Sequence, residues 1–314
     1  MTQSRFAEPP PDMVTPRRNQ IDLHTHTDRS DGVLAPRALY DAMRDWGLRL
    51  VAVADHDTLS GYRELAAAGV GARPSPEGPQ LIPAVEINSV ADDELMRMGV
   101  QLEEGELHVL GYGVDADDAA FEQRLAAQRE ARRTRLLLII EALRRLGKPI
   151  DEQIAPYLES EEALGRPHIA RAMVAAGHVA SVQDAFDLWI DRDGPAYVAR
   201  QGMHTREAIE AIADAGGLPV LAHYPAAPDQ PELIRLLMGW GVRGLEVHYR
   251  RFLPETVGRL AGLCSELALV ATGGSDYHGD GMSYAEAQGT TYVPSEVGER
   301  LLEALSGSRA GSRG

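Results

Sequence analysis

Short apolar runs rich in β-branched residues alternate along the chain with segments in which apolar residues recur at helical spacing. The apolar runs lie at 20–25, 50–54, 81–87, 107–112, 218–223, 243–248 and 268–273. The clearest helical segments between them are 36–46, 205–215, 230–240 and 254–267. This alternation is typical of an α/β fold with a parallel sheet, and seven strands favour a closed (β/α)7 barrel over an open sheet.

One long stretch, 115–199, breaks the alternation because it is mostly helical and contains no good strand. We interpret it as a helical insertion carried by a barrel that is formed from 20–114 and 200–305. Its longest predicted helix, 121–146, is rich in arginine: Arg124, Arg129, Arg132, Arg133, Arg135, Arg144 and Arg145. Two interpretations stay open, since these arginines form either a solvated face paired with glutamates or a cap over an anionic substrate.

Both ends of the chain differ in composition from the rest. Residues 1–19 are rich in proline and polar side chains and lack the apolar run of a secretion signal, so we predict a disordered leader and a cytoplasmic protein. The segment 306–314 predicts a disordered tail. No apolar run approaches the ~20 residues of a membrane span, so a membrane protein is excluded.

The charge and cysteine content narrow the function further. Lys+Arg number 31 against 47 Asp+Glu, a net charge of −16, which argues against binding of long DNA or RNA over a basic surface. The single Cys264 can form neither an intramolecular disulfide nor a thiolate metal cluster. Any metal ion would therefore be held by histidine, aspartate and glutamate.

Histidines and carboxylates gather beside the predicted strands. On the first strand His24 and His26 project to the same side, because side chains alternate along a strand, and the turn that follows brings the Asp31 carboxylate back toward them. Further candidates accompany the later strands: His56, Glu86, His108, His223, Asp276 and His278. Since active sites of β/α barrels lie at the shared carboxyl ends of the strands, we expect these side chains to meet there. His108 fits least well, because it is near the start of its predicted strand.

This set of donors predicts a metal cluster. Nine potential ligands exceed the four to six or so that one ion takes, and so they favour two or three ions. Imidazole mixed with carboxylate, without thiolate, suits Mn²⁺, Fe or Zn²⁺ better than Mg²⁺ or Ca²⁺, which prefer oxygen ligands.

The same residues belong to motifs that occur in a fixed order: Asp22-Leu23-His24-Thr25-His26, Ser30-Asp31-Gly32, Ala54-Asp55-His56-Asp57-Thr58, Glu86, His108, Ala222-His223 and Gly274-Ser275-Asp276-Tyr277-His278-Gly279. This ordered set resembles the polymerase and histidinol phosphatase (PHP) superfamily of metal-dependent phosphoesterases. The resemblance implies a distorted seven-stranded β/α barrel. Within the superfamily the chain is most similar to the branch of nucleoside 3′,5′-bisphosphate phosphatases and ribonuclease AM type 5′→3′ exonucleases, which also carries a helical insertion before segments like 165–171 and 194–198.

The resemblance implies three metal positions with one shared ligand. The first ion would be held by His24, His26, Glu86 and Asp276. The second would share Glu86 and be held also by His108 and His223. The third would be held by Asp31, His56 and His278. A hydroxide held between two such ions is the expected nucleophile, so that no serine or cysteine nucleophile is needed.

Three other residues are candidates for work on the substrate. Arg166 and His168 are candidate phosphate contacts, because guanidinium pairs bidentately with phosphate oxygens. His248 would project to the same side as Glu246 on the sixth strand and could protonate the leaving oxygen. A structural role for each of the three stays open. The acidic segment 91–107 is interpreted as a solvated loop and given no role.

The predicted function is hydrolysis of a phosphate monoester of a small nucleotide such as a nucleoside 3′,5′-bisphosphate. The first alternative is a 5′→3′ exonuclease acting on short 5′-phosphorylated RNA or DNA. Histidinol-phosphate hydrolysis would use the same ligands, and a non-catalytic metal-binding domain is the remaining possibility. The acidic composition favours a small substrate over a long one.

Overall fold

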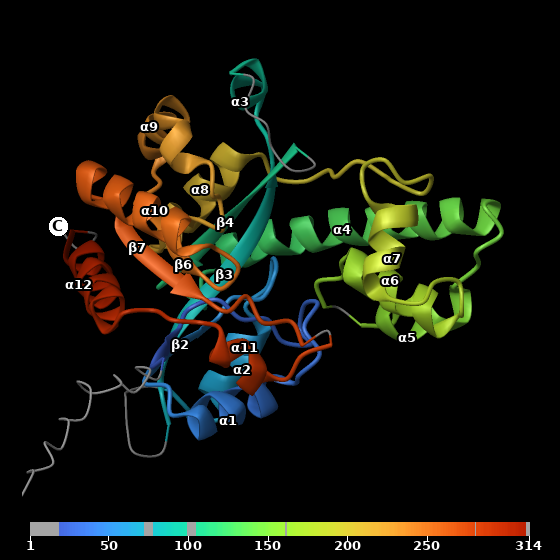
Figure 1. Cartoon of the computed structure of the whole chain (residues 1–314), viewed down its shortest axis with the longest axis horizontal. Coiled ribbons are helices and arrows are strands. Elements are labelled where there is room, and N and C mark those ends of the chain that lie inside the picture. Colours follow the sequence, from blue (N-terminus) through green and yellow to red (C-terminus); the bar gives the residue numbers. More distant parts are fainter. Residues whose placement is uncertain (1–18, 72–77, 99–104, 161, 280, 312–314) are drawn as a thin grey trace, which may run out of the picture.

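Seven strands form one sheet in chain order in the computed structural model, which describes residues 19–71, 78–98, 105–160, 162–279 and 281–311 (Figure 1). The strands are β1 (Ile21–Asp22), β2 (Leu50–Val53), β3 (Gln80–Val90), β4 (Glu106–Tyr112), β5 (Leu218–Leu221), β6 (Gly244–Tyr249) and β7 (Val270–Gly274). Each falls on one of the seven predicted apolar runs. The prediction of a distorted seven-stranded α/β barrel is confirmed.

The sheet closes because the chain after β1 pairs with the end of β7 and with the chain that follows it. The N–H of Leu23 donates to the carbonyl of Gly273 at 3.1 Å, and the N–H of His26 donates to that of Tyr277 at 3.0 Å. These bonds continue beyond the regular strands and hold the two segments that contain His24 and Asp276 side by side.

β4 departs from the all-parallel sheet that the alternation predicted. It pairs antiparallel with both β3 and β5, whereas the remaining neighbours are parallel. The described part of the β3–β4 connection contains only the five-residue helix α3 (Asp93–Arg97), and a parallel return needs a longer crossover. As a result the amino end of β4, which carries His108, lies at the same rim as the carboxyl ends of its neighbours.

The interior of the barrel is apolar at one end and polar at the other. Leu23, Leu110 and Val220 fill the interior, and Val297 and Leu301 of the last helix, α12 (Ser295–Gly311), pack against them. This plug buries the end of the barrel opposite the histidine-bearing rim. α12 extends through residue 311, into the segment from 306 that was predicted to be a disordered tail. Residues 312–314 lie outside the described residues.

The outer helices cover the barrel and pack on a second apolar layer. They are α1 (Pro36–Trp46), α2 (Ser60–Ala67), α8 (Thr205–Asp214), the turn η3 (Ala227–Asp229), α9 (Pro231–Trp240), α10 (Pro254–Leu267) and α11 (Tyr284–Gly289). The predicted leader lies outside the described residues except for Asn19, which is buried and donates to Gln288 Oε1 at 2.8 Å. In the part of the chain that is described, no helix is both long and apolar enough to span a membrane.

The helical insertion stands to one side of the barrel (Figure 1). It comprises α4 (Ala119–Arg145), α5 (Asp151–Leu158), α6 (Arg166–Ala175), α7 (Val182–Ala185) and the π-helix η2 (Phe186–Ile190). α4 joins the two parts: Phe121 packs in the outer layer of the barrel, whereas Ile139 lies in a separate apolar core of the insertion. The stretch of α4 between these cores faces the histidine-bearing rim.

Candidate metal centre

Four side chains converge on one point at the rim. His24 Nε2 and His26 Nε2 lie 3.1 Å apart, and Glu86 Oε2 is 3.1 Å from the first and 3.2 Å from the second. Asp276 Oδ1 lies 3.5 Å from His24 Nε2 and 3.3 Å from His26 Nε2. The chain directly after β1 carries both histidines, β3 carries Glu86 and the loop after β7 carries Asp276.

The carboxylate of Glu86 extends this group on its other side. Its second oxygen, Oε1, lies 2.8 Å from His108 Nδ1 and 3.1 Å from His223 Nε2. The antiparallel direction of β4 explains why His108 reaches the rim from the start of its strand. Glu86 is only 1% exposed and is the residue common to both groups.

A third group forms around Asp31, in the turn after β1. Asp31 Oδ1 lies 3.2 Å from His278 Nε2, and Asp31 Oδ2 lies 3.6 Å from His56 Nε2. His26 belongs to this group as well as to the first, so it is a candidate for a further shared ligand that the resemblance did not suggest. All nine predicted ligands therefore lie in one continuous cluster.

The spacing and chemistry of these atoms fit divalent ions. Metal–ligand bonds of about 2.1 Å place neighbouring ligand atoms about 3.0–3.4 Å apart, close to the 2.8–3.5 Å seen within the first two groups. His26 Nδ1, Asp31 Oδ1 and His56 Nδ1 are buried and make no hydrogen bond among the described residues. Buried nitrogen and carboxylate atoms of this kind require a compensating charge, which a cation provides.

The carboxylates of the centre are held in their ionised form. Burial alone would raise the pKa of Glu86, but the fields of His56, His24 and His108 outweigh it and hold that pKa well below the usual value. The pKa of Asp276 is likewise lowered against burial, chiefly by His278 and His24. Each is therefore available as an anionic ligand at neutral pH.

Metal binding is expected to release protons and to strengthen as pH rises. In the metal-free protein, burial lowers the pKa of His278, but Asp31 and Asp276 more than compensate and raise it to about 10. At neutral pH this imidazole is therefore protonated, and an ion must displace its proton to bind. Isothermal titration with Mn²⁺ in buffers of different ionisation enthalpy should show proton release, with affinity rising between pH 6 and 8. A pH-independent affinity without proton release would contradict this account.

Glu246 on β6 forms hydrogen bonds with two of the candidate ligands, His24 and His223. The sequence alone suggested no role for it. His24 Nδ1 donates to Glu246 Oε1 at 2.9 Å, and the backbone N–H of His223 donates to Oε2 at 2.9 Å. Glu246 thus fixes the proton of His24 on Nδ1 and leaves Nε2 free to face the cluster. It also restrains His223, whose φ of 26° is unfavourable for a residue with a β-carbon.

Replacing Glu246 should weaken metal binding while leaving all nine ligands in place. In Glu246→Gln the amide can still accept one hydrogen bond but loses the charge that favours the His24 tautomer, and metal affinity should fall about 10- to 100-fold. Competition with a chelating dye measures this affinity. Glu232→Gln, at an exposed position on α9, is the matched control. Unchanged metal affinity in Glu246→Gln would show that the contact has no supporting role.

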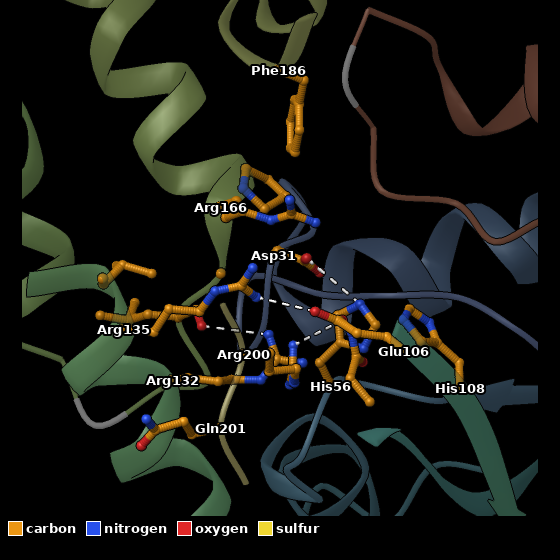
Figure 2. A pocket seen from close by; sticks show the side chains of 15 residues that line it. Asp31, His56, Glu106, His108, Arg132, Arg135, Arg166, Phe186, Arg200 and Gln201 are labelled. Atoms are coloured by element: carbon orange, nitrogen blue, oxygen red, sulfur yellow. Dashed lines mark hydrogen bonds and ion pairs between the residues drawn. The ribbon is translucent and has the colours of Figure 1, made fainter. Parts of the chain in front are cut away.

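An arginine-lined cavity of ≈ 160 Å³ adjoins the cluster at Asp31, His56 and His108. Figure 2 shows the arginines of the insertion reaching across to these barrel residues. The arginines come from α4, the start of α6 and the chain after η2: Arg132, Arg135, Arg166 and Arg200. The cavity is too small for a nucleotide, since ligand pockets usually exceed about 300 Å³, but it has room for a phosphate group.

Each of these four arginines is paired with a carboxylate, and the partner of Arg166 is Asp191. Asp57 pairs with Arg132 and Arg200, and Glu106 pairs with Arg135 at 3.3 Å and Arg200 at 3.5 Å. Burial and the nearby Arg132 lower the pKa of Arg200 to about 10 despite these partners. Arg132 Nη2 and Arg200 Nε are buried and make no hydrogen bond among the described residues, so donors remain available for an anion.

The chain and its fold are similar to known phosphoesterases. It is 31% identical over 265 residues to the 5′-3′ exoribonuclease Rnm of Escherichia coli, covering 82% of this chain and 84% of the relative. It is 26% identical over 287 residues to the 3′,5′-nucleoside bisphosphate phosphatase of Chromobacterium violaceum, covering 87% and 92%. A solved structure of a proposed metal-dependent phosphoesterase from Bifidobacterium adolescentis matches with a TM-score of 0.75 and 30% identity over 90% of this chain and 96% of that one. No protein-family model matches the chain.

The match to the Escherichia coli protein decides the family, because it exceeds 30% identity over most of both chains. The chain belongs to the PHP superfamily. This PHP protein is an enzyme, a metal-dependent hydrolase of phosphoric esters, as predicted.

The residues that the sequence predicted to contact the substrate of this PHP enzyme lie in different places. Arg166 lines the arginine cavity, where its guanidinium lies 5.4 Å from the centre of the Phe186 ring and 3.0 Å from Asp191 Oδ1. His168 is 3% exposed and outside the cavity lining, and its Nδ1 contacts the backbone of Gly165 at the start of α6. The position of His168 supports a structural role for this residue rather than a contact with phosphate.

His248 does not lie beside Glu246 as the predicted alternation required. A β-bulge between Glu246 and His248 inserts an extra residue into β6. Tyr249 takes the inward position instead, and its hydroxyl donates to Asp276 Oδ2 at 3.0 Å. His248 lines neither the arginine cavity nor the neighbouring pocket on the other side of the centre.

The arginine-rich helix of this PHP enzyme combines both interpretations that the sequence left open. Arg132 and Arg135 are buried and face the cavity. Arg144 and Arg145 form exposed pairs with Glu141. Glu106, assigned to a solvated loop, and Arg200 were missed, because nothing local in the sequence indicates that the insertion and β4 meet.

Proposed function

We propose that this PHP enzyme removes the 3′-phosphate of a nucleoside 3′,5′-bisphosphate, with the nine side chains of the cluster holding two or three Mn, Fe or Zn ions. The observation that carries the proposal is a phosphate-sized arginine cavity directly beside the cluster. A substrate with two phosphates one nucleoside apart can place one at the cluster and the other among the arginines. The name of the Chromobacterium violaceum relative agrees with this substrate class.

Some side chains of the site bind the substrate, and others orient the metal ligands. Divalent ions bound in the cluster supply Lewis-acid stabilisation of the phosphoryl oxygens and lower the pKa of water. Arg132, Arg166 and Arg200 bind the second phosphate through charged hydrogen bonds and so fix the scissile ester against the cluster. Glu246 holds the proton of His24 on Nδ1, which orients the ring. Closure of the cavity by the insertion limits the access of water to these contacts.

The test compares substrates that differ by a single phosphate. Manganese-loaded protein is assayed for phosphate release from adenosine 3′,5′-bisphosphate, adenosine 3′-monophosphate and histidinol phosphate. Contacts of the 5′-phosphate with at least two arginines should favour the bisphosphate about 100-fold in kcat/KM. Equal or better hydrolysis of adenosine 3′-monophosphate or of histidinol phosphate would contradict the proposal, because neither fills both positions.

A 5′→3′ exonuclease is the second candidate function. A short 5′-phosphorylated RNA or DNA chain also carries a terminal phosphate one nucleoside away from the scissile phosphate, so it can occupy the same two positions. The name of the Escherichia coli relative agrees with this alternative.

A further inference from the structure

The turn at 27–32 brings Asp31 to the metal centre in a tightly closed conformation. The N–H of Gly32 donates to the carbonyl of Thr27 at 2.9 Å. A β-carbon at position 32 would collide with the backbone carbonyl of His26, so only glycine permits this close approach. Because the turn is closed in this way, the groups that hold it in place also determine where the Asp31 carboxylate lies.

The barrel holds this turn through Asp55, which directly precedes the candidate ligand His56. Asp55 Oδ1 accepts hydrogen bonds from the N–H of Thr27 and from the hydroxyl of Ser30, both at 2.7 Å, and Oδ2 accepts one from the hydroxyl of Thr27 at 2.7 Å. Asp55 is only 1% exposed. Three hydrogen bonds to one buried carboxylate fix the turn against the chain after β2, and so they set the position of Asp31 relative to His56.

The helical insertion holds the same turn, although it supplies none of the nine candidate ligands. Arg171 on α6 donates through Nη2 to the backbone carbonyl of Asp31 at 2.6 Å. The N–H of Ala163 donates to the carbonyl of Arg29 at 3.2 Å, and the side chain of Arg29 pairs with Glu162. The barrel and the insertion therefore both bind the one turn that carries Asp31.

Only the third of the candidate metal positions takes a ligand from this turn. The second group comes from β3, β4 and the chain after β5. In the first group the N–H of Asp276 donates to the carbonyl of His24 at 2.8 Å, which joins these two ligands where the barrel closes. An ion at either position keeps its ligands when the turn moves, whereas an ion at the third position loses the Asp31 carboxylate.

We propose that Arg171 and Asp55 are positioning residues for the third metal position, and that contact of the insertion with the turn is needed to fill it. The inference rests on the proposed function for the presence of the ions, but not for the identity of the substrate. The insertion then has two roles, because it lines the arginine cavity and also completes the metal centre.

The test counts the ions that each variant binds, so it needs no substrate. Arg171→Met removes the donor to the Asp31 carbonyl, and Thr27→Val removes the hydroxyl that Asp55 binds while keeping the shape of the side chain. Metal-free wild type and both variants are titrated with Mn²⁺, and free Mn²⁺ is measured by electron paramagnetic resonance. Each variant should bind the third ion about 10- to 100-fold more weakly than wild type and the first two with unchanged affinity.

Conservative variants separate positioning from a general loss of structure. Arg171→Lys and Thr27→Ser each keep a donor, and each should bind the third ion more tightly than the matching variant without one. Arg206→Met, at a position 57% exposed on α8, is the control and should bind all ions as wild type does.

Three results would overturn the inference: unchanged affinity for the third ion in either Arg171→Met or Thr27→Val, equal weakening of all ions, or a wild type that binds only two ions at saturating Mn²⁺. A wild type that binds three ions but releases no phosphate from adenosine 3′,5′-bisphosphate would instead overturn the proposed function. The ion counts of the variants would still test the positioning roles in that case.

Discussion

The Glu86→Gln variant should lose its bound metal ions. Its phosphate release should also fall more than about 100-fold. Loss of a residue that only supports a ligand typically costs about 10–100-fold, and Glu86 lies between two groups of predicted ligands. Its two oxygens contact five histidines: His24, His26, His56, His108 and His223. The amide of glutamine keeps the shape but offers one oxygen and no charge. Activity on adenosine 3′,5′-bisphosphate and metal content by mass spectrometry measure the two losses.

Circular dichroism checks that the Glu86→Gln variant remains folded. We expect it to fold, because the apolar core of the barrel lies at the end opposite the cluster. Glu64→Gln, at an exposed position paired with Arg29, is the matched control and should retain wild-type metal content. A folded Glu86→Gln protein with full metal content and full activity would contradict the assignment of Glu86 as the shared ligand.

Arg200→Met should reduce kcat/KM for adenosine 3′,5′-bisphosphate about 10- to 100-fold, mostly through a higher KM. The lost side chain is 6% exposed, and its Nε is free of hydrogen bonds among the described residues, so we expect it to donate to the second phosphate. The loss on adenosine 3′-monophosphate should be much smaller, since that substrate lacks the second phosphate. Steady-state kinetics on both substrates measure the difference.

Arg145→Met is the matched control for Arg200→Met, because Arg145 is 76% exposed on α4, where it pairs with Glu141. It should leave both substrates unaffected. An equal loss on both substrates in Arg200→Met would show that Arg200 acts on the fold of the cavity rather than on the second phosphate.

The sequence predicted the strands and the cluster because both signals are local. Apolar runs mark strands wherever they occur, and alternation along the extended segment that begins with β1 is enough to predict His24 and His26 on the same side. The remaining candidate ligands follow or flank other strands. Closure of a barrel brings these positions together whatever conformation its loops adopt. The direction of β4 was missed because a connection that contains acidic residues and one short helix has no pattern that distinguishes a hairpin from a crossover.

The parts that the sequence did not predict depend on contacts between distant segments. Glu106 and Arg200 are 94 positions apart and become partners only when the insertion folds against β4. Glu246 is an ordinary strand residue until β1 places His24 beside it, and the bulge that turns His248 away has no marker in the sequence. The net charge of −16 likewise conceals a cavity that is lined by four arginines, Arg132, Arg135, Arg166 and Arg200.

Stripping and restoring metal on one sample tests the central claim most directly. The protein is freed of metal with a chelator, reloaded stepwise with Mn²⁺, and assayed at each step for phosphate release from adenosine 3′,5′-bisphosphate. We predict that the stripped protein is inactive and that activity returns as two or three ions per chain bind. Full activity in metal-free protein, or no phosphate release from a fully loaded and folded one, would contradict the account.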